Sequence, residues 1–230
     1  DAPATWQVSK TMTVSNEEEL AAAMEVIAQN GGEITIPATA TLTLNDVAAF
    51  SIQHPTVITI DGTVSTTTQW MITNDSELTL RGTGTYTCPQ GIVRNNGTLI
   101  VEGGTWETTI NQSGTAFYNN DANAVLTLKD VDVNAAFFAV AGIGTINIEG
   151  GSISSTSSNK YGSWAYTIRA ENNCQMTLKD VTVEGVQGCI AAIGGSHILC
   201  DNVTSVAKES EPGRGDAYYA LFAASEGIIE

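Results

Sequence analysis

The chain has 230 residues, which is enough for one domain with a continuous core. Its formal net charge is −16 with only 9 Lys+Arg, which disfavours nucleic acid or an anionic membrane surface as a partner. No apolar run is long enough to span a bilayer, so we expect no membrane insertion of this segment. The first residue is Asp1, so we expect that an upstream segment such as a signal peptide has been removed.

Residues 1–32 predict a leading strand and then a helix. Residues 1–14 have the apolar alternation of a strand, and Ser15 with Glu18 matches a capping box that begins a helix. Gly31-Gly32 is a helix stop. The apolar stripe of this helix consists of Leu20, Met24 and Ile27. Because the helix directly precedes an array of repeats, we expect it to cover the open end of that array.

A five-residue pattern of apolar, polar, apolar, charged and turn residue recurs along the chain. The copies begin at Ile58, Leu78, Leu99, Leu126, Ile146, Met176 and Ile198. Successive copies are 20, 21, 27, 20, 30 and 22 residues apart, a period typical of a solenoid with one short strand per repeat. Period-two alternation places the apolar residues of each copy on one face. The sequence therefore predicts stacked coils over residues 33–230, continuing past Glu230 or covered there by a partner.

The charged position of this pattern alternates in sign from copy to copy. Its residues are Asp61, Arg81, Glu102, Lys129, Glu149, Lys179 and Asp201. If coils stack about 4.8 Å apart, each charge lies between two opposite charges. An exposed ion pair contributes only about 0–1 kcal/mol, so we interpret the column as a device that fixes coil register. The alternative is a row of charges that binds a ligand.

Asparagine ends the segment that precedes several copies of the pattern. These residues are Asn74, Asn95-Asn96, Asn119-Asn120 and Asn172-Asn173. Asparagines stacked at one turn can hydrogen-bond along the stack. On these residues and repeats, the chain resembles the right-handed parallel β-helix of the pectate-lyase-like superfamily. The resemblance implies an all-β, right-handed, single-stranded solenoid with an N-terminal capping helix.

Lyases of this superfamily imply clustered acidic residues for calcium, and the sequence offers Asp130, Asp132 and Asp180. The alternative is that Asp130 and Asp180 are turn residues at the position where other copies have Gly. Gly195-Ser196-His197-Ile198 resembles the Gly-Ser-His-Gly motif of polygalacturonase-like members, but its last residue is Ile. The paired Asp of those members is absent, and glycoside hydrolysis needs two carboxyl groups. We therefore predict no catalytic residue, no metal and no cofactor, with calcium only if the chain is a lyase.

Two binding features come from irregular stretches of the chain, and the first lies in a stretch that lengthens the repeat. Tyr161, Trp164 and Tyr166 in the stretch Ser152–Asn173 predict an aromatic platform for sugar rings, and the alternative is that Trp164 and Tyr166 face the core. The other long stretch covers Trp106–Asn123. Arg214-Gly215-Asp216, in a polar loop, matches a tripeptide that adhesion receptors recognise.

The four cysteines show no metal-ligand spacing, and Cys200 falls on an apolar column. We predict that Cys88, Cys174, Cys189 and Cys200 are free thiols rather than disulfides.

These observations lead us to expect a non-catalytic rod of an extracellular, secreted or cell-surface bacterial protein, of the adhesin type. The expected partners are glycans or a host surface protein, and an oligomer through the uncapped C-terminal end is an open alternative. Two other functions stay open, a polysaccharide lyase acting on an acidic glycan and a phage tail or capsid appendage.

Overall fold

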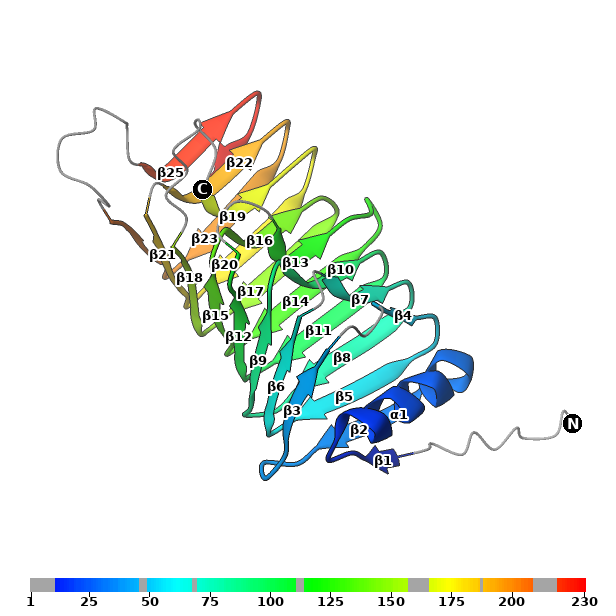
Figure 1. Cartoon of the computed structure of the whole chain (residues 1–230). Coiled ribbons are helices and arrows are strands. Elements are labelled where there is room, and N and C mark those ends of the chain that lie inside the picture. The colour runs from blue at the N-terminus through cyan, green and yellow to red at the C-terminus, as the bar shows by residue number, and fades with distance from the viewer. Residues whose placement is uncertain are drawn as a thin grey trace, which may run out of the picture.

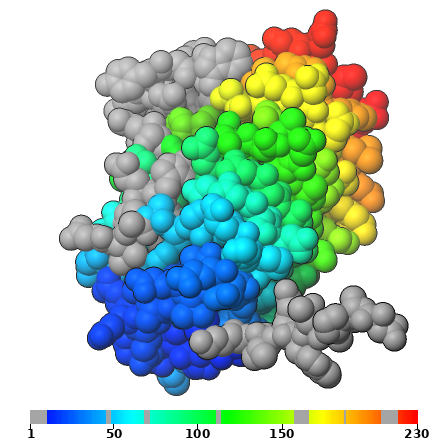
Figure 2. Space-filling model, turned by 90° about the vertical axis from the view of Figure 1, so that its right-hand side faces the viewer, coloured from blue at the N-terminus to red at the C-terminus, as the bar shows by residue number. Residues whose placement is uncertain are grey.

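The computed structural model describes residues 11–45, 49–67, 70–110, 114–156, 166–186, 188–208 and 219–230. Over these ranges, three parallel sheets run along the molecule, and each of eight coils contributes one strand to each sheet (Figure 1). The coils stack in chain order from the N-terminal helix to the last strands (Figure 2). The predicted all-β parallel β-helix with an N-terminal capping helix is therefore confirmed.

We name the three sheets A, B and C by the order in which the chain enters them. Sheet A contains β1 (Thr11–Thr13), β2 (Gly32–Ile36), β5 (Thr56–Ile60), β8 (Glu77–Arg81), β11 (Thr98–Glu102), β14 (Val125–Lys129), β17 (Thr145–Glu149), β20 (Gln175–Lys179), β23 (His197–Asp201) and β26 (Ile228–Ile229). Sheet B contains β3 (Thr41–Leu44), β6 (Thr63–Thr66), β9 (Thr85–Cys88), β12 (Thr105–Thr108), β15 (Asp132–Ala135), β18 (Ser152–Ser155), β21 (Thr182–Gly185) and β24 (Thr204–Ala207). Sheet C contains β4 (Phe50–Ile52), β7 (Trp70–Asn74), β10 (Gly91–Asn95), β13 (Thr115–Asn119), β16 (Phe138–Gly142), β19 (Tyr166–Ala170), β22 (Gly188–Ile193) and β25 (Tyr219–Ala224).

Helix α1 (Glu17–Asn30) lies at the N-terminal end of the stack, against the first coil (Figure 1). Its N-cap is Asn16, whose side chain accepts a hydrogen bond from the Glu19 backbone at 2.9 Å, and Glu19 accepts one from the Ser15 backbone at 2.7 Å. The predicted capping box of Ser15 and Glu18 is therefore wrong, and the side chains of Asn16 and Glu19 bind the backbone at the helix start instead. The predicted stripe is buried and also includes Ala23, so the helix closes the apolar interior.

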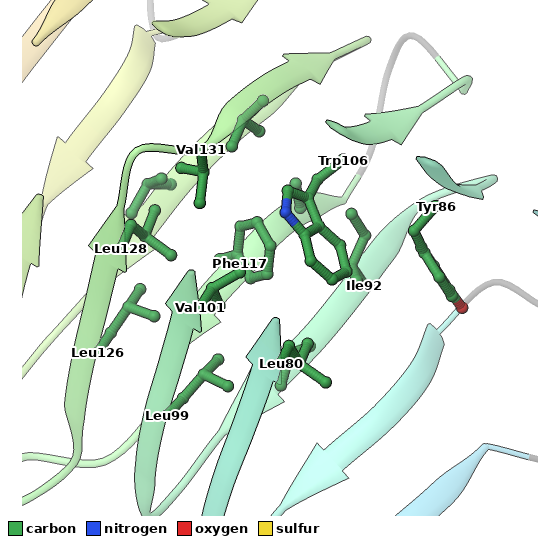
Figure 3. Close-up of a cluster of buried hydrophobic side chains, with 14 of the residues drawn as sticks. Leu80, Tyr86, Ile92, Leu99, Val101, Trp106, Phe117, Leu126, Leu128 and Val131 are labelled. Carbon is green, nitrogen blue, oxygen red and sulfur yellow. The ribbon is translucent and has the colours of Figure 1, made fainter. Parts of the chain in front are cut away.

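The inward face of every sheet forms one continuous apolar core. In the middle coils, Trp106 lies 5.8 Å from Tyr86 and 5.7 Å from Phe117, between ring centroids, and all three are buried (Figure 3). Burying a large apolar side chain contributes about 1.5–3 kcal/mol, so stacking stabilises strands that are too short to bury their own faces.

The predicted charge column is confirmed from Arg81 to Asp201, where each residue pairs in register with one of opposite sign. Lys129 lies 3.6 Å from Glu102, and Lys179 lies 3.1 Å from Glu149. The prediction is wrong for the first pair of the column, because Arg81 pairs with Thr59 rather than with Asp61.

A two-residue shift between β5 and β8 explains this exception. Ile58 pairs with Leu80, although the sequence pattern aligns it with Leu78. Because strand side chains alternate with period two, such a shift keeps the same residues facing inward. Arg81 instead reaches two coils back, where its Nη2 lies 2.7 Å from Glu33 Oε1.

The predicted asparagine ladder is confirmed in the turns that join sheet C to sheet A. Asn74 Nδ2 donates to Asn95 Oδ1, and Asn95 Nδ2 donates to Asn119 Oδ1, both at 2.7 Å, and all three side chains are fully buried. Gly142 and Ala170 hold this position in the next coils, so the ladder ends at Asn119. Asn172 and Asn173 lie outside it, at the positive φ angles of 45° and 65°.

A second, more exposed row lies beside the buried ladder. Asn96 Nδ2 donates to Asp75 Oδ1 at 2.6 Å, and Asn120 Nδ2 donates to Asn96 Oδ1 at 2.7 Å. We call Asp75, Asn96 and Asn120 the outer amide row.

All four cysteines are free, as predicted, and Cys88, Cys174 and Cys189 are buried whereas Cys200 is half-buried. Burial raises the pKa of the Cys174 thiol to about 12, so this thiol stays protonated and packs as an apolar group. Within the described ranges, no helix has both the length and the apolar character needed to cross a membrane.

Candidate functional site at the corner between sheets B and C

Most connections between the strands of successive sheets are two to five residues long, including 89–90 and 136–137 between sheets B and C. Turns from sheet A to sheet B are short, as at residues 103–104, 130–131 and 150–151. The connections from sheet B to sheet C include the long stretches 109–114, 156–165 and 208–218. We call this edge, where the strands of sheet B end and those of sheet C begin, the B–C corner. Long connections on a rigid body are where binding residues concentrate, so this corner is the candidate site.

The two stretches that lengthen the repeat contain fewer residues outside the strands than the sequence predicted. Strands β12 and β13 occupy much of Trp106–Asn123, and β18 and β19 occupy much of Ser152–Asn173. Trp106 itself is a buried core residue. The extra residues are therefore confined to the corners between strands.

Tyr166, one of the predicted platform residues, begins β19 at the B–C corner. It is only 4% exposed, and its ring stacks on Phe222 with centroids 5.3 Å apart and an interplanar angle of 25°. Tyr219 packs against the same Phe222 ring at 5.5 Å. Burial, with a smaller contribution from Tyr219, raises the pKa of Tyr166 to about 12, so its hydroxyl stays protonated. The burial of Tyr166 favours a supporting role under the corner.

The other predicted binding residues belong to the two longest connections. Tyr161 and Trp164 fall within 156–165, and Arg214-Gly215-Asp216 falls within 208–218; all five lie outside the described residues and stay predictions. Strands β18 and β21 are hydrogen-bonded neighbours, as are β21 and β24, so both connections leave the same sheet at the same corner.

Tyr219, which no pattern in the sequence marks as a binding residue, is 43% exposed at this corner. Its position becomes meaningful only once β25 is seen to pair with β22, with Tyr219 opposite Gly188. Gly188 leaves room for the Tyr166 ring, because a Cβ atom at this position would collide with that ring. The aromatic patch of Tyr166, Tyr219 and Phe222 is therefore assembled by stacking.

Sheet B presents an outward row of mostly small polar side chains at the start of its strands, beside the turns from sheet A. The row runs through Thr41, Thr63, Thr85, Thr105, Asp132, Ser152, Thr182 and Thr204. Hydroxyl groups both donate and accept hydrogen bonds, so this face suits a hydroxyl-rich ligand.

The three aspartates considered for calcium do not converge. Asp130 and Asp180 occupy equivalent turns with φ of 49° and 53°, and Gly150 holds the same turn on the coil between them. Asp180 Oδ1 accepts a hydrogen bond from Asn202 Nδ2 at 2.6 Å, and Asp132 lies on sheet B. In the described part of the chain, no group of three or more His, Cys, Asp or Glu residues is placed to hold a metal ion. The turn interpretation of Asp130 and Asp180 is confirmed.

Gly195-Ser196-His197 also has a structural explanation. Ser196 is buried, and its Oγ donates to the Ile193 carbonyl at 2.6 Å, which closes the turn before β23. His197 Nε2 lies 3.3 Å from Glu230 Oε2. The motif is therefore part of a turn between sheets C and A.

The chain matches a family model over residues 24–216, and that family is described as the BigA third pectate lyase-like domain. The comparisons with curated proteins and with solved structures gave no match. The matched region contains the helix end, the repeats and the asparagine turns described above, and it covers most of the chain. The chain therefore belongs to the family of the BigA third pectate lyase-like domain.

Proposed function

We propose that this domain is a non-catalytic rod of an extracellular bacterial surface protein that presents the B–C corner for contact with a glycan or a host surface. One observation carries the proposal. The longest connections, 156–165 and 208–218, leave one corner of a solenoid whose turns from sheet A to sheet B are short. A rigid stack with variable connections on one edge is a common arrangement for binding.

The chemistry around the corner supports a glycan as the contacted surface. Tyr219 and Phe222, which stacks on the buried Tyr166, offer apolar ring faces, and the outward row of sheet B offers hydroxyl groups. Sugars present both apolar ring faces and many hydroxyls, so these two surfaces of the rod complement them. The separation of Asp130, Asp132 and Asp180 supports binding without turnover.

The test is to incubate the purified protein with acidic and neutral polysaccharides, with and without calcium, and to measure both binding and new chain ends. We expect binding to at least one polysaccharide and no new chain ends. Formation of new ends would contradict the non-catalytic proposal, and Asp132→Asn would then be the first variant assayed. An oligomer in solution without any binding would favour the phage-appendage alternative.

Two variants distinguish a glycan from a host protein as the contacted surface. Trp164→Ala should weaken polysaccharide binding, whereas Asp216→Asn should weaken attachment to cells that display integrin-type receptors. Glu77→Gln is the control for Asp216→Asn, because it removes one carboxylate from an exposed position of sheet A, outside the outward row of sheet B. Equal loss in all three variants would indicate misfolding, which thermal unfolding detects.

A further inference from the structure

One outward column of sheet C brings two arginines toward a tyrosine. Arg94, Tyr118, Ala141 and Arg169 pair in register on four successive coils. Arg94 extends onto the next coil, where its Nη2 donates to Asn120 Oδ1 at 3.0 Å. Arg169 extends back onto the preceding coil, where its guanidinium carbon lies 5.7 Å from the centre of the Phe138 ring. Arg94 therefore reaches onto the coil of β13 and Arg169 onto the coil of β16, and both charges act on Tyr118 between them in the column.

Coil register does not explain these two positive charges. Across the strands, Arg94 faces Thr73 and Tyr118, and Arg169 faces Ala141 and Ala191, all of them neutral. In sheet A, by contrast, Lys129 and Lys179 each stand between two acidic residues. The chain has only 9 Lys+Arg against 25 Asp+Glu, so two arginines on one patch form a local exception to its acidity.

Arg169 is held in a defined orientation. Its Nε lies 2.8 Å from Glu171 Oε1, and the two side chains are 27% and 20% exposed, the least exposed ion pair in the described ranges. Phe138, beneath the guanidinium, is itself packed edge-on against Phe137 at 4.2 Å. A guanidinium fixed in this way loses little conformational freedom when a ligand binds.

Tyr118 supplies a hydroxyl donor between the two arginines. Burial raises its pKa, Glu171 acts in the same direction, and Arg94 and Arg169 act in the opposite direction, so the hydroxyl stays protonated at neutral pH. In the described part of the chain, this hydroxyl makes no hydrogen bond to protein. The outer amide row runs beside it and ends at Asn120.

We propose that Arg94, Tyr118 and Arg169 bind the carboxylate of one acidic sugar at the end of an otherwise neutral glycan. Guanidinium groups recognise carboxylates through paired N–H donors, and the tyrosine hydroxyl adds a third donor. The oxygens of the outer amide row then accept hydrogen bonds from the hydroxyls of the neighbouring sugar.

The charge balance sets the limit of one carboxylate. Around Tyr118, the two arginines and Glu171 sum to a single positive charge on a chain of formal charge −16, and the outer amide row beside them begins with the carboxylate of Asp75. A polyanionic chain that extends beyond the patch meets like charge, whereas a terminal acidic sugar on a neutral chain does not. This inference rests on the glycan-binding role proposed above, but it concerns sheet C rather than the connections of the B–C corner.

The test uses the whole chain and measures dissociation constants for 3′-sialyllactose, for lactose and for a tetramer of galacturonic acid by ligand-observed NMR. We expect 3′-sialyllactose to bind and the other two to bind at least tenfold more weakly. Arg94→Gln should weaken 3′-sialyllactose binding about tenfold, because it removes a charge-assisted donor. Tyr118→Phe should weaken it about threefold.

Arg81→Gln is the matched control, since it removes the same charge from an outward position of sheet A. It should leave the affinity within twofold. Arg94→Gln keeps Glu171 paired with Arg169, and unchanged unfolding of the variant would show that its fold is intact.

Four outcomes would overturn the inference. The first three are no binding of 3′-sialyllactose, equal affinity in Arg94→Gln, and equal or tighter binding of the galacturonate tetramer. Equal binding of N-acetylglutamate would also overturn it, in favour of a protein carboxylate as the ligand. If 3′-sialyllactose fails while a polysaccharide still binds in a Trp164-dependent way, the proposed function stands and only this inference falls.

Discussion

The outward columns of sheets A and C follow different rules, although the same coils contribute to both. In sheet A, Glu102, Lys129 and Glu149 alternate in sign across hydrogen-bonded strands. In sheet C, the corresponding outward column runs from Arg94 through Tyr118 and Ala141 to Arg169, with no repeating chemistry. A column that repeats can be explained by stacking alone. A column that departs from the repeat needs another explanation, and binding is the one we propose.

The largest expected effect concerns a column that repeats and is also buried. Asn95→Ala removes the middle of the asparagine ladder and leaves the amide groups of Asn74 and Asn119 without that partner. Because unsatisfied buried polar groups are costly, we expect the free energy of unfolding to fall by about 3–5 kcal/mol. Urea unfolding measures it. Asn96→Ala in the outer amide row is the control and should lose about 1 kcal/mol or less.

Tyr86→Phe tests the inward column of sheet B. The Tyr86 hydroxyl is buried without a hydrogen-bond partner in the described structure, and in Figure 3 it points away from Trp106. Removing it should raise the free energy of unfolding by about 1 kcal/mol, which corresponds to about 2–4 °C in the midpoint of thermal unfolding. A loss of stability would show instead that a bound water satisfies this hydroxyl.

Lys129→Glu tests whether the alternating column of sheet A fixes register. The change places three carboxylates in a row, because Glu102 and Glu149 pair with this position. We expect a loss of about 1 kcal/mol or less, which shrinks at high salt because the charges are exposed. Lys129→Gln is the control. Insensitivity of the difference between the two variants to salt would argue against the electrostatic explanation.

Arg94→Gln tests whether the outward column of sheet C contributes to stability. Its strand neighbours Thr73 and Tyr118 are neutral, so we expect the free energy of unfolding to change by about 0.5 kcal/mol or less. The same variant should lose ligand affinity. A large loss of stability would place Arg94 among the residues that hold the coils together and would weaken the contrast between the two sheets.

The pH dependence of the column in sheet A provides the smallest expected effect. The hydrogen bond that Lys179 Nζ donates to Glu149, together with the charge of Glu149, raises the pKa of Lys179 above its ordinary value of 10.5. A pKa raised by folding stabilises the folded state below pH 10.5, and that contribution disappears as the pH rises through the folded value. The stability difference between the wild type and Lys179→Gln should therefore be constant near neutral pH and should disappear at strongly alkaline pH. A difference that widens there would contradict this assignment.

Local patterns in the sequence determined much of the fold. The alternation around Leu99 and Val101 specifies a half-buried strand, and the asparagines at residues 74, 95 and 119 mark one turn of the coil. Helix α1 follows from its cap and its apolar stripe. Each of these signals lies within a few residues of chain, which is why it can be read without the structure.

The tertiary structure decided what depends on how one coil sits on another. A shift of two residues between paired strands leaves the alternation of inward and outward side chains unchanged. The sequence could therefore not exclude the shift that separates Asp61 from Arg81. Arg94, Tyr118 and Arg169 lie far apart along the chain, as do Tyr166 and Phe222, and only stacking brings them together. The sequence by itself determined the repeating unit, because that unit rests on local periodicity. Coil register and the connections placed at the B–C corner determined the candidate binding surfaces.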